Sequence, residues 1–161
     1  MNTTEQSSFI IIGIAARTSN AKEMSGEGVI GDQWERVMAG VMVEQIPNRA
    51  DQNIIAMYTD YESDANGEYT FIIGAIVTSV DSIPEGMVAK QVPEARYAVF
   101  TSEKGPVWKV VPEVWQNIWS TPASEMGGER AFIADVEVYD DRSADPQNAV
   151  AEVWVGIRQG T

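Results

Sequence analysis

The chain contains no cysteine and no histidine among its 161 residues. The lack of cysteine excludes a disulfide framework, a thiolate nucleophile and sulfur ligands for a metal. The lack of histidine removes the commonest general base and the commonest transition-metal ligand. We therefore expect no cofactor and no metal site, and a nucleophilic triad of the acyl-transfer type is implausible.

Positive charge and long hydrophobic runs are also scarce. Lys and Arg number 11 against 24 Asp and Glu, which gives a net charge of −13 spread over both halves of the chain. A surface this acidic repels phosphate backbones and anionic lipids, so we expect neither direct nucleic-acid binding nor membrane association. No apolar run approaches the ~20 residues of a membrane span. The polar start "MNTTEQSS" has no signal-peptide pattern, which favours a cytoplasmic protein.

Apolar residues make up 44% of the sequence, enough for one domain with a sizeable core. Hydrophobic periodicity predicts strands at 9–18, 53–63 and 68–79 with a helix at 29–39, and then strands at 87–92, 94–102, 129–140 and 149–158 with a helix at 104–120. The apolar face of the second helix is predicted at Val111, Trp115, Ile118 and Trp119.

Each half therefore contains the order strand, helix, strand, strand. We predict an α+β fold of duplicated β-α-β-β units with pseudo-twofold symmetry, whose antiparallel sheet carries packed helices. Residues 1–161 would form a single domain. Its first repeat spans about 9–79, its linker 80–86 and its second repeat 87–158.

Three polar motifs receive structural interpretations. "GEGVIG" (26–31) matches the dinucleotide-binding pattern G-x-G-x-x-G, but residues 19–25 separate it from the preceding strand, so we interpret it as the flexible start of a helix. The segment "YTDYESD" (58–64) lacks the longer oxygen-rich run, the glycine and the closing Glu of a calcium loop, so its acids indicate a solvated strand end. Asp135 and Glu137 alternate along one strand and indicate a wet sheet face.

The last strand, "AVAEVWVGIR" (149–158), holds one acid in an apolar setting. Its period of two places Glu152, Trp154 and Gly156 on one face. A buried ionised carboxylate costs several kcal/mol when it is unpaired. Two interpretations remain open: Glu152 pairs with a base such as Arg158, or it meets a cationic ligand for which Gly156 leaves room.

Aromatic residues are the other notable feature, with five tryptophans and five tyrosines. Trp34, Trp115 and Trp119 fall on the predicted helices, and Trp154 falls on the last strand. One or two of them are expected in the ordinary core. Several indoles and phenols near one carboxylate would make a site for a flat or bulky organic cation, through the ring quadrupole and the charge together.

Segments 58–77, 87–120, 135–140 and 151–157 strongly resemble the GyrI-like effector-binding domain of AraC-type and multidrug-responsive transcription regulators. Within this family the resemblance extends to stand-alone integron cassette members that bind cationic drugs. It implies two β-α-β-β units around a cleft for small molecules, with the hallmark acid at Glu152 in the motif Glu-Val-Trp-Val. The ligand-binding residues it implies, together with the aromatic residues considered above, are Glu152, Trp154, Trp34, Trp115, Trp119, Tyr58 and Tyr61.

The resemblance implies a module that binds amphipathic, cationic aromatic small molecules. An alternative is a hydrolase acting on a small reactive ligand, with Glu152 as base and Tyr58 or Tyr61 as acid. A third possibility is an interaction subunit that works with a separate DNA-binding regulator or as a homo-oligomer. Because only eight residues precede Phe9, we expect a stand-alone module without a DNA-binding domain.

Overall fold

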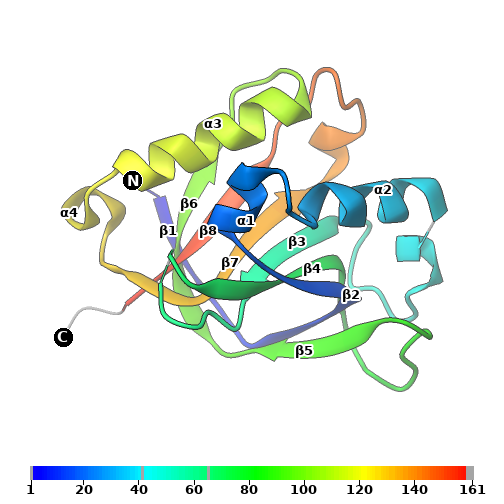
Figure 1. Ribbon diagram of the computed structural model, residues 1–161. Coiled ribbons are helices and arrows are strands. Elements are labelled where there is room, and N and C mark those ends of the chain that lie inside the picture. Colours follow the sequence, from blue (N-terminus) through cyan, green and yellow to red (C-terminus); the bar gives the residue numbers. More distant parts are fainter. Residues whose placement is uncertain (1, 41, 65, 159–161) are drawn as a thin grey trace.

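The chain folds around one antiparallel sheet that carries helices on one face (Figure 1). The computed structural model describes residues 2–40, 42–64 and 66–158. The strands are β1 (Asn2–Gln6), β2 (Phe9–Ser19), β3 (Ile54–Thr59), β4 (Glu68–Val77), β5 (Val88–Val92), β6 (Ala95–Thr101), β7 (Arg130–Tyr139) and β8 (Glu152–Ile157). The helices are α1 (Asn20–Ser25), α2 (Ile30–Gly40), α3 (Val107–Ser120) and α4 (Ala123–Met126), with 3-10 turns η1 (Met42–Gln45) and η2 (Asp141–Ser143). Among these described residues, no helix is long and apolar enough to cross a membrane.

The strand order confirms the predicted fold class. The eight strands are arranged β1-β6-β8-β7-β3-β4-β2-β5, so the order β2-β4-β3 of the first half is mirrored by β6-β8-β7 of the second. The two halves join where β3 pairs with β7, and Ala56 lies directly opposite Glu137 in that pairing. The sheet is therefore continuous across the pseudo-twofold axis.

The edge strands differ from the expected pattern. β1 was not predicted, because its sequence NTTEQ has no apolar alternation, yet it pairs with β6 along its whole length. Polar residues suit such an edge strand, since one side of it faces solvent. β5 falls in the predicted second half but pairs with β2 of the first. Each half thus contributes an edge strand to the other.

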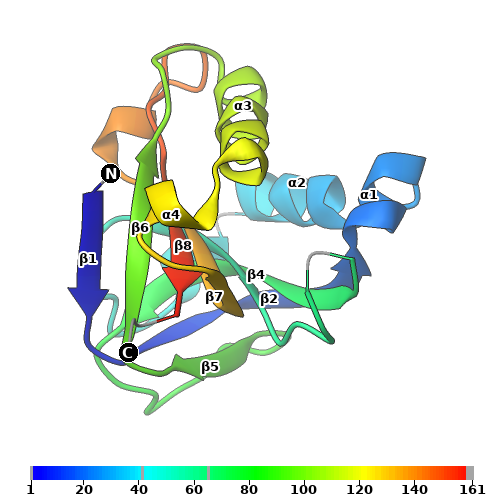
Figure 2. The same ribbon diagram turned by 90° about the vertical axis from the view of Figure 1, so that its left-hand side faces the viewer.

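Both faces of the sheet are buried. Under α2 and η1, one cluster includes Ile12, Val37, Val43 and Phe71, and a second cluster under α3 and α4 includes Val153. The helix-free face carries a third cluster, whose buried members are Ile11, Ile55, Met57, Ile72, Val92, Ala134, Val136 and Val138. Figures 1 and 2 show that the two ends of the sheet run in clearly different directions, so side chains of this face are covered by the sheet's own curvature.

Two glycines allow β2 and β4 to approach closely. Gly13 and Gly74 are direct partners in the β2–β4 pairing. A Cβ atom on Gly13 would lie 2.1 Å from the Ile73 carbonyl oxygen, and one on Gly74 would lie 1.8 Å from the Ile12 carbonyl oxygen. Because both obstructing atoms belong to backbone, no side-chain rotation can relieve the contact.

We expect Gly74→Ala to lower the free energy of unfolding by about 1–3 kcal/mol, because the strand pair must separate to admit the methyl group. Gly31→Ala in α2 is the matched control, since nothing lies within 4 Å of its added Cβ. That control should gain about 0.5–1 kcal/mol from better helix propensity. Urea unfolding of both variants measures the difference, and equal midpoints would contradict the close-approach argument.

Candidate ligand-binding site

A cavity of about 720 Å³ lies between α3 and the α1–α2 segment, with β3 and β7 beneath it. This volume falls within the usual range for small-molecule sites. Figures 1 and 2 show α3 and α2 on the same side of the sheet. The aromatic residues that line the cavity are Trp34, Tyr58, Tyr61, Tyr69, Trp108, Trp115, Trp119 and Tyr139.

Helix α3 contributes one of its two apolar sides to this cavity. Trp108, Trp115 and Trp119 line it, whereas Val110, Val114 and Ile118 are buried in the core. The predicted apolar face combines Ile118 with Trp115 and Trp119. In the structure Ile118 belongs to the side of α3 that packs on the core, and the two tryptophans belong to the side that lines the cavity. Trp108 and Trp119 are 60% and 55% exposed, so they lie at the rim rather than in the core.

The carboxylate of Glu137 lies at the centre of the site. Its side chain is 2% exposed, and its Oε2 atom accepts hydrogen bonds from the Tyr58 hydroxyl at 2.7 Å and from Trp115 Nε1 at 2.8 Å. Its Oε1 atom accepts one from the Tyr139 hydroxyl at 2.5 Å. Donors from β3, β7 and α3 therefore converge on one buried acid.

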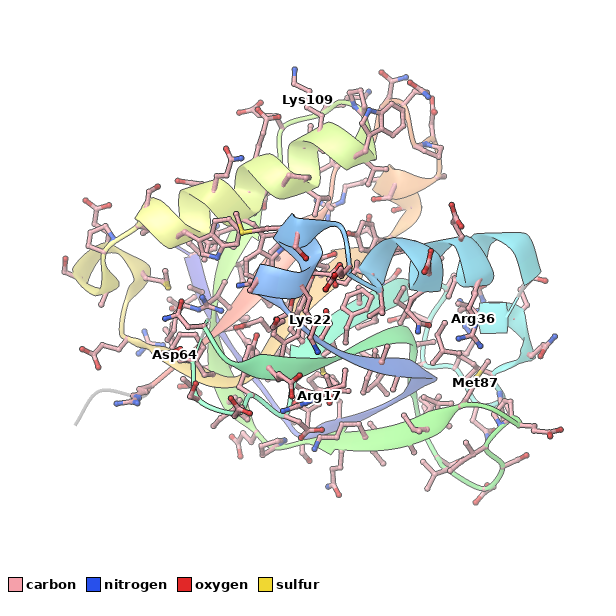
Figure 3. The ribbon with its side chains drawn as sticks, viewed as in Figure 1. Arg17, Lys22, Arg36, Asp64, Met87 and Lys109 are labelled. Atoms are coloured by element: carbon pink, nitrogen blue, oxygen red, sulfur yellow. The ribbon has the colours of Figure 1, made fainter. Side chains whose placement is uncertain are left out.

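All three donors to Glu137 are neutral groups. Among the described residues, no Lys or Arg lies within 4.0 Å of its carboxylate. Lys109 of α3 points away from the sheet (Figure 3). Burial raises the pKa of Glu137, although the hydrogen bonds from Tyr139, Tyr58 and Trp115 act in the opposite direction. Burial and the Glu137 carboxylate raise the pKa of Tyr58 and of Tyr139 well above the usual range, so both remain donors at neutral pH.

The aromatic groups around Glu137 follow the pseudo-twofold arrangement. Trp34 packs edge-on against Tyr139 with ring centroids 5.0 Å apart, and Trp115 packs edge-on against Tyr58 at 5.2 Å. Trp34 and Trp115, Tyr58 and Tyr139, and Ala56 and Glu137 are separated by the same sequence offset. Two equivalent Trp–Tyr pairs thus flank a centre that holds alanine in one half and glutamate in the other.

A second buried acid on β7 is neutralised. Asp135 is fully buried, and its carboxylate accepts from Arg130 Nη2 at 2.7 Å, from the Gly156 N–H at 2.9 Å and from the Tyr61 hydroxyl. The interpretation of Asp135 and Glu137 as a wet sheet face is therefore wrong. The helices and the cavity wall cover that face, and the strand's alternation cannot distinguish a covered polar face from a solvated one.

A third carboxylate, Glu23 of α1, lies in the cavity wall beside the start of α2. It accepts from the Thr18 hydroxyl at 2.6 Å and from the backbone N–H groups of Val29 and Ile30 at 2.8 and 3.2 Å. The "GEGVIG" segment thus connects two helices and directs its amides at the chain's own carboxylate. This arrangement suits the positive end of the α2 dipole.

Glu152 and Trp154 are not among the residues that line the cavity. The sheet register explains this, because Val153 lies opposite Glu137 and shares its helix-covered face, which leaves Glu152 on the other face. Glu152 accepts from Arg142 Nη2 at 2.7 Å and from Trp154 Nε1 at 3.0 Å. The expected grouping of Glu152 with Trp154 is correct, but it faces away from the cavity, and the partner base is Arg142 rather than Arg158.

Gly156 also has a role different from the expected one. A Cβ atom there would lie 2.7 Å from the Ala134 carbonyl oxygen, so glycine permits close strand approach and does not make room for a ligand. The hydrolase alternative required Glu152 beside Tyr58 or Tyr61. Both tyrosines line the cavity and Glu152 does not, so the structure does not bring that acid and base together.

Five of the seven expected ligand-binding residues line the cavity: Trp34, Trp115, Trp119, Tyr58 and Tyr61. The cavity is also lined by residues that the sequence patterns do not indicate as site residues, among them Glu137, Tyr139, Tyr69, Trp108 and Arg130. The alternation of Asp135, Glu137 and Tyr139 on β7 was the available signal. Three polar groups on one face of an otherwise apolar strand can mark a lined cavity as well as a wet surface.

Comparison with known proteins agrees with this architecture. Over residues 3–157 the chain matches the family model described as integron-associated effector binding protein. YobU of Bacillus subtilis (strain 168), named as a candidate transcriptional regulator, is 36% identical over 148 residues, or 91% of either chain. The solved structure of VCH_CASS2, an integron cassette protein from the mobile metagenome of Vibrio cholerae, is 27% identical with a TM-score of 0.73, covering 98% of this chain and 95% of that one.

A second solved structure, that of SAV2435 bound to tetraphenylphosphonium, has a TM-score of 0.78 at 16% identity and covers 98% of this chain and 93% of that one. At this identity it shows a common fold. The resemblance to effector-binding domains that the motifs indicated is confirmed by the family match, which extends over nearly the whole described chain. The chain belongs to the family of integron-associated effector-binding proteins.

Proposed function

We propose that this protein binds cationic aromatic small molecules in the cavity, with Glu137 as the counter-ion. The observation that carries the proposal is a carboxylate 2% exposed that receives three neutral donors, lies inside an aromatic cavity and has no ion pair with any described residue. A cationic ligand would supply the missing positive charge.

The energetics favour a ligand of this kind. Removing a carboxylate from water costs several kcal/mol, and hydrogen bonds from neutral groups offset that cost only in part. A cation that displaces water above Glu137 would gain a Coulomb interaction strengthened by the low local dielectric. The indole and phenol rings would add cation–π contacts of about 2 kcal/mol each when desolvated.

The comparisons support the same class of ligand. SAV2435, whose fold is similar, was solved with tetraphenylphosphonium, a bulky aromatic cation. The matched family is described as effector binding, and YobU is named as a candidate transcriptional regulator. A protein of this family that senses amphipathic cations would need an apolar, aromatic cavity with one carboxylate at its centre.

Glu137→Gln keeps the size of the side chain and removes its charge. We expect it to lower the affinity for tetraphenylphosphonium at least about tenfold, because a charge-assisted contact contributes roughly 1.5–3 kcal/mol. Glu152→Gln is the matched control on the opposite face of the sheet and should leave the affinity unchanged. Calorimetric titration measures both constants. A comparable loss in the two variants would contradict the assignment of Glu137.

The affinity should also depend on pH. Because burial raises the pKa of Glu137, a series that begins near the ordinary glutamate pKa of about 4.3 starts with a protonated, neutral site. Tetraphenylphosphonium keeps its charge at every pH, so its affinity should rise as pH passes through the Glu137 pKa and then level off. In Glu137→Gln this rise should disappear, and its persistence there would assign the titration to another group.

In the ligand-free protein, the contribution of Glu137 to the free energy of unfolding should fall as pH rises, whereas the ligand affinity should rise. The folded-state pKa of Glu137 lies above its unfolded value, so the folded state holds this proton more tightly. The contribution of this group is therefore fully present below the unfolded pKa and is lost as pH rises through the folded pKa. Thermal unfolding should accordingly show that Glu137→Gln gains stability relative to the wild type as pH rises. A constant difference across the series would contradict the raised pKa.

A further inference from the structure

We propose that Arg130 forms a second polar subsite of the cavity, in which its Nη1 group binds a hydrogen-bond acceptor of the ligand. The ligands favoured by this arrangement are dipolar or zwitterionic aromatic molecules, with a cationic group for Glu137 and a carbonyl or carboxylate oxygen for Arg130. The inference rests on the proposed function, because it assigns a second group of the ligand held by Glu137.

Most N–H groups of the Arg130 guanidinium form no hydrogen bond with a described residue. A guanidinium carries five N–H donors. Its Nη2 atom donates to Asp135 at 2.7 Å, and its Nε atom is buried without a hydrogen-bond partner in the described part of the chain. Nη1 donates no hydrogen bond to any described residue. Because Arg130 lines the cavity and its side chain is 15% exposed, we assign the two N–H groups of Nη1 to the ligand.

The guanidinium is held in place before any ligand arrives. Its Cζ atom lies 4.4 Å from the centroid of the Phe132 ring and 5.9 Å from that of Trp115. Asp135 accepts a hydrogen bond from Arg130 Nη2, and its carboxylate is itself held by hydrogen bonds from the Gly156 N–H and the Tyr61 hydroxyl. A planar donor group positioned in this way loses little side-chain entropy when it binds an acceptor.

The backbone of β7 is irregular where it carries this group. The pairing with β8 shifts register between Arg130 and Asp135, and Phe132 has a positive φ of 53°. Such a conformation is unfavourable for a bulky residue and persists where its surroundings fix it. Here it accompanies the stacking of the Phe132 ring on the Arg130 guanidinium, so the irregular segment carries the group that we assign to the ligand.

Glu137 and Arg130 place opposite charges on two sides of Trp115, while the third charged lining residue, Glu23, accepts hydrogen bonds from the start of α2. Glu137 accepts from the Nε1 edge of the Trp115 indole, and Arg130 lies near the face of the same ring. Asp135 neutralises Arg130 but is fully buried and is not part of the lining, so the positive end of this ion pair is the one turned to the cavity. A ligand with groups of opposite polarity would therefore be oriented by the two residues.

Two dyes that differ by one carboxylate test the proposal. Tetramethylrosamine is a cationic xanthylium, and tetramethylrhodamine adds a carboxylate to its phenyl ring. In the wild type we measure the ratio of their two dissociation constants by fluorescence titration. In the double variant Arg130→Met/Asp135→Asn, which removes both charges of that ion pair and so does not leave an ionised Asp135 without its partner, the preference for the carboxylate dye should fall about tenfold.

Arg130→Lys is the second variant, because it keeps the charge and a partner for Asp135 while losing the planar fork. It should lose part of the same preference. An unchanged ratio of dissociation constants in both variants would overturn the Arg130 subsite while leaving Glu137 untouched. If instead Glu137→Gln binds tetramethylrosamine as tightly as the wild type does, the proposed function itself fails, so the two failures are distinguishable.

Discussion

A buried carboxylate that has no cationic partner among the described residues is the constraint around which the other features of this protein are arranged. The donors to Glu137 come from positions far apart in the sequence: Tyr58 belongs to the first half of the chain, and Trp115 and Tyr139 to the second. They converge only when β3 pairs with β7 in the observed register and α3 packs on the sheet. The site is therefore a product of the docking of the two halves, and the register of one strand pair determines its geometry.

The pseudo-twofold arrangement explains why the cavity has a single central acid. Related Trp–Tyr pairs approach the axis from both sides, and both tyrosines donate to the same carboxylate. At the axis, Ala56 faces Glu137 across the β3–β7 pairing. A second glutamate there would place two like charges in one apolar site, which would force one of them to remain protonated. Alanine at position 56 avoids this repulsion, so tyrosines from both halves donate hydrogen bonds to a single carboxylate.

The fold class could be predicted because periodicity reports burial, and the strands and the two main helices carry clear patterns. The central acid could not be predicted in the same way. Both faces of this sheet are buried, one by helices and one by curvature, so an acid on either face of a strand has apolar neighbours in the sequence. Glu152 and Glu137 therefore look alike locally, and only the register between β7 and β8 separates them. The polar edge strand β1 was missed for a related reason, since its pairing depends on β6 and not on its own pattern.

The contrast between Asp135 and Glu137 indicates how one strand can carry both a structural acid and the acid that we propose as a ligand's counter-ion. The two residues share a face of β7 and are both buried. Among the described residues, Asp135 pairs with a guanidinium, whereas Glu137 receives hydrogen bonds from two phenols and an indole. Neutral donors orient a carboxylate without cancelling its charge, whereas an arginine beside Glu137 would already occupy the place of a cation. Burial raises the pKa of Glu137, and the hydrogen bonds from Tyr139, Tyr58 and Trp115 act in the opposite direction. Selectivity for positive charge in this cavity would then follow from whether each acid accepts hydrogen bonds from neutral or from cationic side chains, more than from the number of acids present.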